Sequence, residues 1–385
     1  MISEKPLRAE NLRIHNKSLV LSLIHQYRSA GISQSVIVEK TGLKAPTILR
    51  IFNELLEDDV IEPVNIAVDD NSSAKKGRRP INFCVKRTAR YSVAIEFWSE
   101  CLSVGIFDFW GEIVQNITYN LKSEMAADDI IKIAVSAVKS GIKAVNVSYE
   151  KIMGIGIAAP GQVDLVKNII TYYPRIQGMQ NYPIVENMQK YFDIPVILNN
   201  NCSAFAAGQL HYGNLNVGDS LFTFLIRSGI NGSFICDDTV FVNSRHRTIE
   251  VGHIPIAMDG PPCVCGKKGC LEACLRTLTL HEKSPVMFGS LDLTKPAARQ
   301  IMDKASRYLC AAVHMFSQIF SPSAYLVAAC DDAVASMLTE YLREKIQKDF
   351  FSDTTPTVLP ARYDPLFALQ GIRDQVISHY FEKMI

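Results

Sequence analysis

Apolar residues along the first quarter of the chain recur at the spacing of amphipathic helices. The pattern predicts helices over residues 16–30, 33–41 and 43–58. Gly31 is expected to end the first helix, and Pro46 suits the first turn of the third. Two helices joined by a short turn that contains glycine form a helix-turn-helix.

Two short apolar runs follow, over residues 60–63 and 81–85, and both are predicted to be strands. The polar loop between them carries a basic cluster at 75–79. A hairpin with a basic tip that follows three helices is the winged form of the motif. We therefore predict a winged helix-turn-helix domain over residues 1–86.

The exposed side chains predicted for this domain are those that DNA requires. Three of them lie outside the apolar stripe of the third helix, where a recognition helix reaches base edges, and three lie in the basic loop, where they reach phosphates or a minor groove. The predicted DNA contacts are Lys44, Thr47, Arg50, Lys76, Arg78 and Arg79. Double-stranded DNA is the expected partner, and an RNA-binding or purely structural role is the alternative.

Beyond about residue 90 the pattern changes to mixed strands and helices. Strands are predicted at 91–96, 102–108, 112–118, 152–158, 196–199, 221–226 and 232–236, and helices at 128–142 and 204–211. Hairpins that precede helical crossovers indicate an α/β fold, and repeated β-β-β-α-β units suit an actin-like, sugar-kinase architecture. The amphipathic stretch at 295–320 is expected to be a core or dimer helix, with a contact surface for a protein partner as the alternative.

The composition shows an uneven distribution of charge along the chain and indicates the cellular compartment. The 385 residues have a formal net charge of +1, but residues 1–90 carry 15 Lys and Arg against 10 Asp and Glu. A basic segment on a mildly acidic body is typical of a nucleic-acid module joined to another domain. We find no signal peptide and no apolar run near the ~20 residues that span a bilayer. We therefore expect a cytoplasmic protein with no membrane partner, whose ten cysteines stay reduced.

Three cysteines and a histidine lie close together in the second half of the chain. Cys263, Cys265 and Cys270 follow His253 in a segment rich in glycine. Three thiolates and an imidazole complete a tetrahedral zinc shell and leave no position for water. We predict one structural Zn²⁺ per chain, and a loop with free thiols is the alternative.

These segments together resemble the ROK family of bacterial sugar-responsive repressors and sugar kinases. The resemblance is carried by Glu250-Val251-Gly252-His253 followed by Cys-x-Cys-Gly-x-x-Gly-Cys-x-Glu, by the Pro-Gly turn within 159–164, and by Gly-Arg-Arg-Pro at 77–80. It covers nearly the whole chain. Among family members, only the repressor branch has the N-terminal winged helix.

The resemblance implies a fold as well as a function. A winged helix-turn-helix is expected to precede a two-lobed, ribonuclease H-like domain with a structural zinc loop over 87–385. Its lobes would cover about 87–198 and 199–385, with the C-terminal helix packed back on the first lobe. By the same resemblance, a sugar lies in the cleft between the lobes.

The resemblance also implies which side chains hold the hydroxyl groups of the sugar. The implied sugar contacts are Asn200, Asn201, Glu250, His253 and Glu272. His253 would serve twice, with one ring nitrogen toward zinc and the other toward the ligand. For the two glutamates the alternative is a structural role in capping the zinc loop.

Departures from the kinases of the family imply that this domain does not phosphorylate its sugar. Asn201 occupies the position of the Asp that deprotonates the sugar hydroxyl, and an amide is not a general base. Glu96-Phe97-Trp98-Ser99 and residues 227–231 replace the two phosphate loops, and Ala328-Ala329-Cys330 replaces the turn that receives adenine. We expect no catalytic residue, no bound ATP and no enzyme activity.

The sequence therefore predicts a DNA-binding transcriptional regulator, a repressor of genes for sugar metabolism or transport. It is expected to act as a homodimer or homotetramer on a pseudo-palindromic operator, with a carbohydrate as effector. Two alternatives stay open, namely an active sugar kinase with a DNA-binding head and a regulator controlled by a protein partner.

Overall fold

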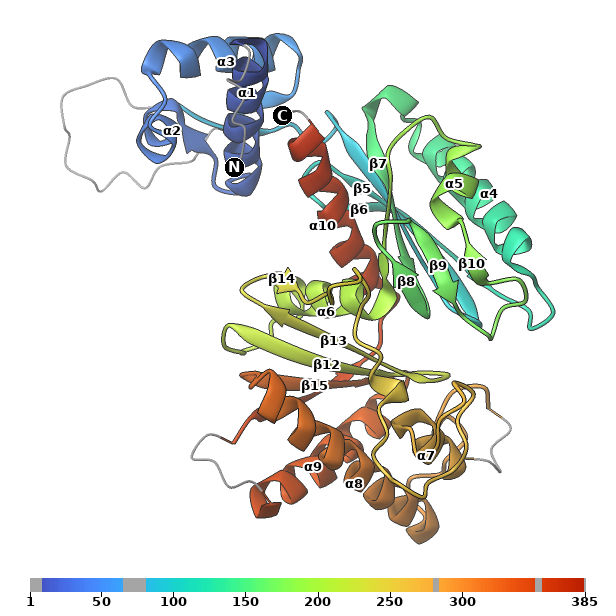
Figure 1. The fold of residues 1–385 in the computed structure, drawn as a ribbon. Coiled ribbons are helices and arrows are strands. Elements are labelled where there is room, and N and C mark those ends of the chain that lie inside the picture. The colour runs from blue at the N-terminus through green and yellow to red at the C-terminus, as the bar shows by residue number, and fades with distance from the viewer. Residues whose placement is uncertain (1–8, 65–80, 280–283, 350–354, 384–385) are drawn as a thin grey trace, which may run out of the picture.

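The computed structural model describes residues 9–64, 81–279, 284–349 and 355–383. Its ribbon separates an N-terminal head from two lobes, and the C-terminal helix lies between the three (Figure 1). Lys76, Arg78 and Arg79 of the basic loop lie outside the described residues.

The head is formed by the elements that precede residue 90. They are α1 (Ala9–Gln26), β1 (Ile32–Ser33), α2 (Gln34–Thr41), α3 (Ala45–Glu57), β2 (Ile61–Val64) and β3 (Asn82–Val85). The strands pair in the order β1-β3-β2. Helix α1 begins earlier than predicted, and there Arg13 forms an ion pair with Glu54 of α3 at 2.7 Å.

The boundaries of α2 and α3 follow from their local sequence. The side chain of Ser33 accepts a hydrogen bond from the main-chain N–H of Val36 at the start of α2. Gly42 ends this helix in the left-handed region, with φ of 68°, and its N–H donates to the carbonyl of Val38. Pro46 stands in the first turn of α3, as predicted.

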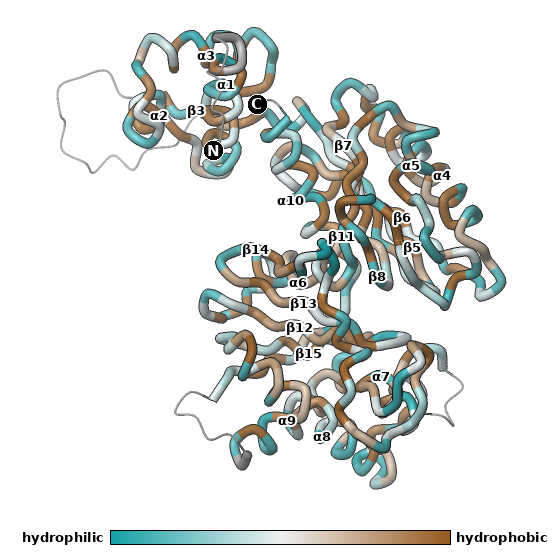
Figure 2. Tube along the Cα trace, viewed as in Figure 1, coloured by the Kyte–Doolittle hydropathy of each residue, from teal (hydrophilic) through white to brown (hydrophobic). Residues whose placement is uncertain are grey.

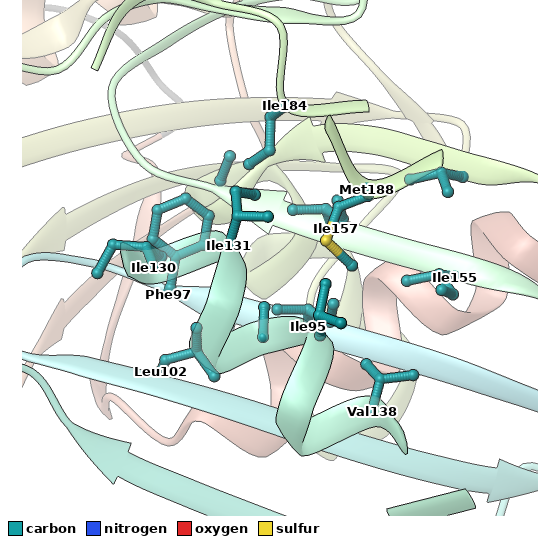
Figure 3. Close-up of a cluster of buried hydrophobic side chains, with 14 of the residues drawn as sticks. Ile95, Phe97, Leu102, Ile130, Ile131, Val138, Ile155, Ile157, Ile184 and Met188 are labelled. Atoms are coloured by element: carbon teal, nitrogen blue, oxygen red, sulfur yellow. The ribbon is translucent and has the colours of Figure 1, made fainter. Parts of the chain in front are cut away.

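The first lobe is built on a mixed sheet with the strand order β11-β7-β4-β5-β6. Its elements are β4 (Tyr91–Phe97), β5 (Cys101–Asp108), β6 (Ile113–Asn120), α4 (Ala127–Val145), η1 (Tyr149–Lys151), β7 (Ile152–Ala159), α5 (Ile184–Gln189) and β11 (Val196–Asn200). In Figure 3, Ile95 and Ile157 of the sheet pack with Ile131 and Val138 of α4 in one buried apolar cluster. A smaller sheet of β8 (Gln162–Asp164), β9 (Ile169–Tyr172) and β10 (Gln180–Tyr182) extends this lobe.

The second lobe repeats this arrangement with the strand order β14-β13-β12-β15-β16. Its elements are α6 (Asn201–Tyr212), β12 (Ser220–Ile226), β13 (Ile230–Cys236), β14 (Thr239–Val240), η2 (Val251–His253), α7 (Leu271–Thr277), α8 (Pro296–Ile319), β15 (Ala324–Ala329), α9 (Asp332–Asp349) and β16 (Thr357–Arg362). In each lobe, antiparallel strands are followed by parallel ones. The predicted repetition of an α/β unit is confirmed.

Helix α8 is the amphipathic stretch predicted at 295–320. Its side chains Met302, Leu309 and Val313 are buried in the core of the second lobe. The helix therefore has the role of a core helix. Figure 2 shows how hydrophobic and hydrophilic residues are distributed over the molecule. Hydrophobic positions lie along the central strands of both sheets, and hydrophilic ones lie in the peripheral turns.

The C-terminal helix α10 (Pro365–Lys383) connects the parts of the molecule. It packs against α6, against β4 and β7 of the first lobe, and against α1 of the head. Gly208 and Gly371 allow the close approach of α6 and α10, because a Cβ at either position would strike the main chain of Phe367 or Ala204. Among the described residues, no helix combines the length and the apolar character needed to cross a bilayer.

The head is attached to the body through α1. Ser18 donates a hydrogen bond to the main-chain carbonyl of Phe381 in α10 at 2.6 Å. The Nε2 atom of His25 lies 2.9 Å from the carbonyl oxygen of Phe109. Burial lowers the pKa of His25 to about 4, so the neutral ring donates its N–H to that carbonyl.

Candidate functional site

A polar cavity of about 560 Å³ lies between the two lobes. The first lobe contributes Trp98, Gly161, Gln162, Tyr172 and Arg175 to its walls, and the second contributes Ser228, Gly229, Glu250, His253 and Glu272. Three of the five predicted sugar contacts are thus brought together, at Glu250, His253 and Glu272. Carboxylates and an imidazole beside aromatic rings are suited to a ligand that presents both hydroxyl groups and apolar faces.

Glu250 stands immediately before η2 and has an altered ionisation. Burial raises the pKa of Glu250 to about 7, and the nearby charge of Glu272 adds to the shift, whereas a hydrogen bond with Gln162 opposes it. This carboxyl group therefore changes its charge near neutral pH.

Glu272 lies in the first turn of α7 and is held from both lobes. Its Oε2 accepts a hydrogen bond from the N–H of Ile230 at 3.3 Å. Its Oε1 accepts from Arg276 at 3.5 Å and from Arg175 of the first lobe at 3.1 Å. Sequence reasoning did not select Arg175, because no local pattern marks a residue that meets its partner 97 positions away.

The four predicted metal ligands form one cluster beside the cavity. The ligand atoms of His253, Cys263, Cys265 and Cys270 all lie within 4.8 Å of one another. Cys263 Sγ is 3.4 Å from His253 Nδ1, and Cys265 Sγ is 3.6 Å from Cys270 Sγ. A tetrahedral shell with Zn–S bonds of about 2.3 Å has edges of roughly 3.5–3.8 Å, so the arrangement fits a metal ion of that size.

The loop of the cluster depends on glycine at two positions. Gly266 and Gly269 have φ of 86° and 67°, in the left-handed region. Gly269 also lies against the main chain of Ala257, where a Cβ would clash. Because His253 lines the cavity as well, the cluster forms part of the cavity wall.

Asn200 and Asn201 are buried and are not among the residues that line the cavity. The side chain of Asn200 caps α6 by accepting from the N–H of Cys202, and it donates to the carbonyl of Gly161 at 2.8 Å. Asn201 donates to the carbonyl of Phe97 at 3.3 Å. Both side chains therefore hold the segments on which the wall is built.

The two segments predicted to replace phosphate loops meet at one end of the interface between the lobes. Arg227 Nη1 lies 2.9 Å from Glu96 Oε1, and both side chains are almost completely buried, with 4% and 0% exposed. The guanidinium also stacks on the rings of Trp98 and Tyr363. Side chains of the protein thus fill this region.

The described part of the predicted DNA surface lies at the start of α3. Lys44 and Arg50 are exposed, and Thr47 is half-buried. The opposite face of the helix is buried in the core of the head, through Ile48 and Phe52 among others. The side chains of Lys44 and Arg50 are accordingly accessible to a partner.

The repeated sheets and the cavity between them define a two-lobed domain of the sugar-kinase-like α/β class. A profile of the ROK family matches residues 93–364, and the chain belongs to this family.

Relatives extend the similarity to the full length of the chain. The xylose repressor of Bacillus subtilis strain 168 is 23% identical over 379 residues, which cover 95% of this chain and 96% of that protein. The N-acetylglucosamine repressor of Escherichia coli O157:H7 is 22% identical over 268 residues, which cover 70% of this chain and 64% of that protein.

Solved structures share the fold. A ROK family transcriptional regulator, a homologue of the E. coli MLC protein, has a TM-score of 0.75 at 19% identity and covers 97% of this chain and 98% of its own. A ROK family glucokinase from Streptomyces griseus has a TM-score of 0.62 at 18% identity and covers 75% of this chain and 99% of its own. Enzymes and regulators therefore share this architecture, so the fold alone does not separate the two functions.

Proposed function

We propose that the protein is a sugar-responsive transcriptional repressor, in which a winged helix-turn-helix domain over residues 1–86 is controlled by a sensor domain over 87–385. The observation that carries the proposal is the placement of α10, which packs on the head and on the lobe that walls the cavity. Relatives named xylose repressor and N-acetylglucosamine repressor support the same function.

A hydrogen-bonded path supports coupling between the cavity and the head. Asn200 bonds to the carbonyl of Gly161, which lines the cavity. Its neighbour Asn199 donates to the side chain of Gln375 in α10 at 2.9 Å. A ligand that moves the Gly161 turn would thereby act on the helix that supports the head, which is the differential contact that allostery requires.

In this proposal the effector is a carbohydrate held by Glu250, His253 and Glu272. Asn200 and Asn201 support the cavity wall through their hydrogen bonds to Gly161 and Phe97. A structural Zn²⁺ on His253 Nδ1 and the three cysteines would fix this wall and leave the other ring nitrogen of His253 for the ligand. Zinc supplies no reactive position in a site closed by four protein ligands. The lobes, at about 87–198 and 199–385, would change their separation when the sugar binds.

The proposed regulator is cytoplasmic, binds no ATP and has no catalytic activity. The filled region around Glu96 and Arg227 supports this, because phosphates would have to displace a buried ion pair. It acts as a homodimer or homotetramer on a pseudo-palindromic operator, and the sugar changes its affinity for the DNA.

The DNA-binding half of the proposal is tested on an operator selected in vitro from random DNA. Lys44→Ala and Arg50→Ala should each weaken operator binding by about tenfold or more in fluorescence anisotropy. Arg299→Ala removes the same charge from an exposed position of the second lobe and serves as the matched control. Unchanged affinity in both head variants would contradict the assignment of α3.

The sensor half is tested on the zinc-loaded full chain by thermal shift with xylose, glucose and N-acetylglucosamine, each with and without ATP. We expect one sugar to raise the melting temperature independently of ATP and to change operator affinity. A shift that requires ATP, or ATP-dependent phosphorylation of the sugar, would favour a kinase instead.

A further inference from the structure

Among the described residues, two ion pairs join the lobes, and they differ in their access to water. Glu96 of the first lobe and Arg227 of the second form the buried pair. Arg175 of the first lobe and Glu272 of the second form the other pair, and these side chains remain 28% and 17% exposed in the cavity wall. Arg227 also lines the cavity but the buried Glu96 does not, so a ligand that enters the cavity can reach both members of the second pair and only the arginine of the first.

Arg175 is the group that ties Glu272 to the opposite lobe. The other donors to this carboxylate, Ile230 and Arg276, belong to the second lobe, like Glu272 itself. Arg276 is further fixed by donating to the carbonyl of Ser228. Among the interactions of the described residues, the bond from Arg175 is the one that must break if Glu272 is to separate from the first lobe.

A carboxylate has about four lone-pair positions, and Glu272 already accepts three hydrogen bonds. A polyol binds such a group with two neighbouring hydroxyl groups, so it needs at least one position that is taken. Arg276 and Ile230 are held by their own lobe, whereas the Arg175 side chain rises from the segment between β9 and β10. Arg175 is accordingly the donor that a sugar can displace.

We propose that Arg175 is a positioning residue that competes with the effector for Glu272 and ties the two lobes together across the cavity in the ligand-free protein. The inference rests on the proposed function and adds the class of ligand, a neutral sugar with adjacent hydroxyl groups. A hydroxyl group of such a sugar takes the place of Arg175 as a hydrogen-bond donor to Glu272. The first lobe then loses this contact with the second. An anionic sugar would instead bind Arg175 directly, because a guanidinium prefers a carboxylate or phosphate.

The competition predicts an unusual response to substitution and to salt. Arg175→Gln should tighten binding of the neutral sugar by about two- to fivefold, the range expected when a partly exposed ion pair no longer competes. Affinity of the unmodified protein should rise between 50 mM and 1 M NaCl, since salt screens the ion pair, whereas Arg175→Gln should show no such rise. A merely structural role for Arg175 would move neither quantity in this direction.

The measurement is calorimetric titration of the zinc-loaded full chain with xylose, glucose and N-acetylglucosamine. Arg175→Lys keeps the charge without the planar fork and should fall between the other two proteins. Arg245→Gln removes an exposed arginine that does not line the cavity and is the matched control, with no expected change. Weaker or equal binding by Arg175→Gln overturns the proposal.

Failure of the proposed function is distinguishable from failure of this inference. If none of the sugars binds either protein, a carbohydrate effector is excluded for this panel and the proposed function loses its sensor half. Hydrogen exchange without sugar then decides the role of Arg175. Amides of residues 173–179 should exchange faster in Arg175→Gln than in Arg245→Gln, and equal exchange overturns the interlobe contact.

Discussion

At one end of the interface between the lobes, Glu96, Arg227, Trp98 and Tyr363 fill the space with a buried ion pair and two rings. Beside this region, and lined in part by Arg227 and Trp98, a cavity of about 560 Å³ stays open between the lobes. In the first region the charge of Glu96 is opposed by that of Arg227, and in the second the carboxyl group of Glu250 is left to titrate near neutrality. The same two-lobed fold thus closes one potential site and keeps another.

This difference separates binding from catalysis in physical terms. A ligand can enter the open region by exchanging hydrogen bonds, which costs little when each bond is replaced. Entry of phosphates at the closed region would require an ion pair to separate inside the protein, which is strongly unfavourable. The two regions share Arg227 and Trp98, so the cavity is best probed at Arg175, Glu250 and Glu272, which are not part of the buried ion pair.

The largest expected effect comes from removing one of the four residues of the proposed zinc site in the wall of the cavity. Metal analysis should find zinc in the unmodified protein and none in Cys270→Ser. Sugar affinity should fall by at least about a hundredfold in this variant, because His253 and the loop before α7 lose their anchor. The N-terminal head of this variant should still bind the operator.

Cys274→Ala is the matched control for this substitution. Cys274 lies one turn further along α7, is buried and is not part of the metal-binding group. It should keep both zinc and sugar binding. Equal loss in the two variants would assign the effect to packing of α7 and not to a metal.

The next effect concerns stability and the closed region. Arg227→Met leaves the Glu96 carboxylate buried without its partner, and we expect a loss of about 3–5 kcal/mol, seen as a lower melting temperature. The double variant Glu96→Leu/Arg227→Met removes both charges and should recover most of that loss. A double variant as unstable as the single one would show that the pair contributes through shape and not through charge.

How far the sequence could predict these two regions depends on the range of the interactions. The ends of α2 and α3 and the grouping of the three cysteines were predictable, because Ser33, Gly42 and the closely spaced cysteines act over a few residues. The filling of the closed region was partly predictable, since aromatic residues replace glycines there.

The roles of Asn200 and Arg175 were not predictable in this way. Asn200 reaches Gly161 because β11 pairs in parallel with β7, with Asn200 opposite Ala159. This register places the side chain of Asn200, which was expected to contact the sugar, behind the wall of the cavity. The Arg175 bond to Glu272 exists only when both lobes have folded and met.

A smaller effect is expected from the titration of Glu250. Hydroxyl groups donate to the ionised carboxylate, so sugar affinity should rise with pH, and it should be about tenfold weaker at pH 6 than above pH 8 for a pKa of about 7. Glu250→Gln should remove this dependence. Folding raises this pKa from its ordinary value of 4.5 to about 7, so the folded protein holds the proton more tightly than the unfolded chain does. The ligand-free protein should therefore lose stability as the pH rises from about 4.5 to about 7, whereas its affinity for the sugar should increase with pH. Affinity that falls as pH rises would mean that the protonated acid is the form that binds.

The smallest effect, no gain of activity at all, is expected for Asn201→Asp with ATP and each sugar of the panel. The change restores a carboxylate at the position where the kinases of the family carry a general base, but Asn201 faces the carbonyl of Phe97 and does not line the cavity. An aspartate there would oppose that carbonyl, and the ion pair of Glu96 and Arg227 would still exclude phosphates. Coupled assays for ADP should therefore stay at the level of Asn201→Ala, and any sugar-dependent ADP release above that level would mean that the closed region opens in solution.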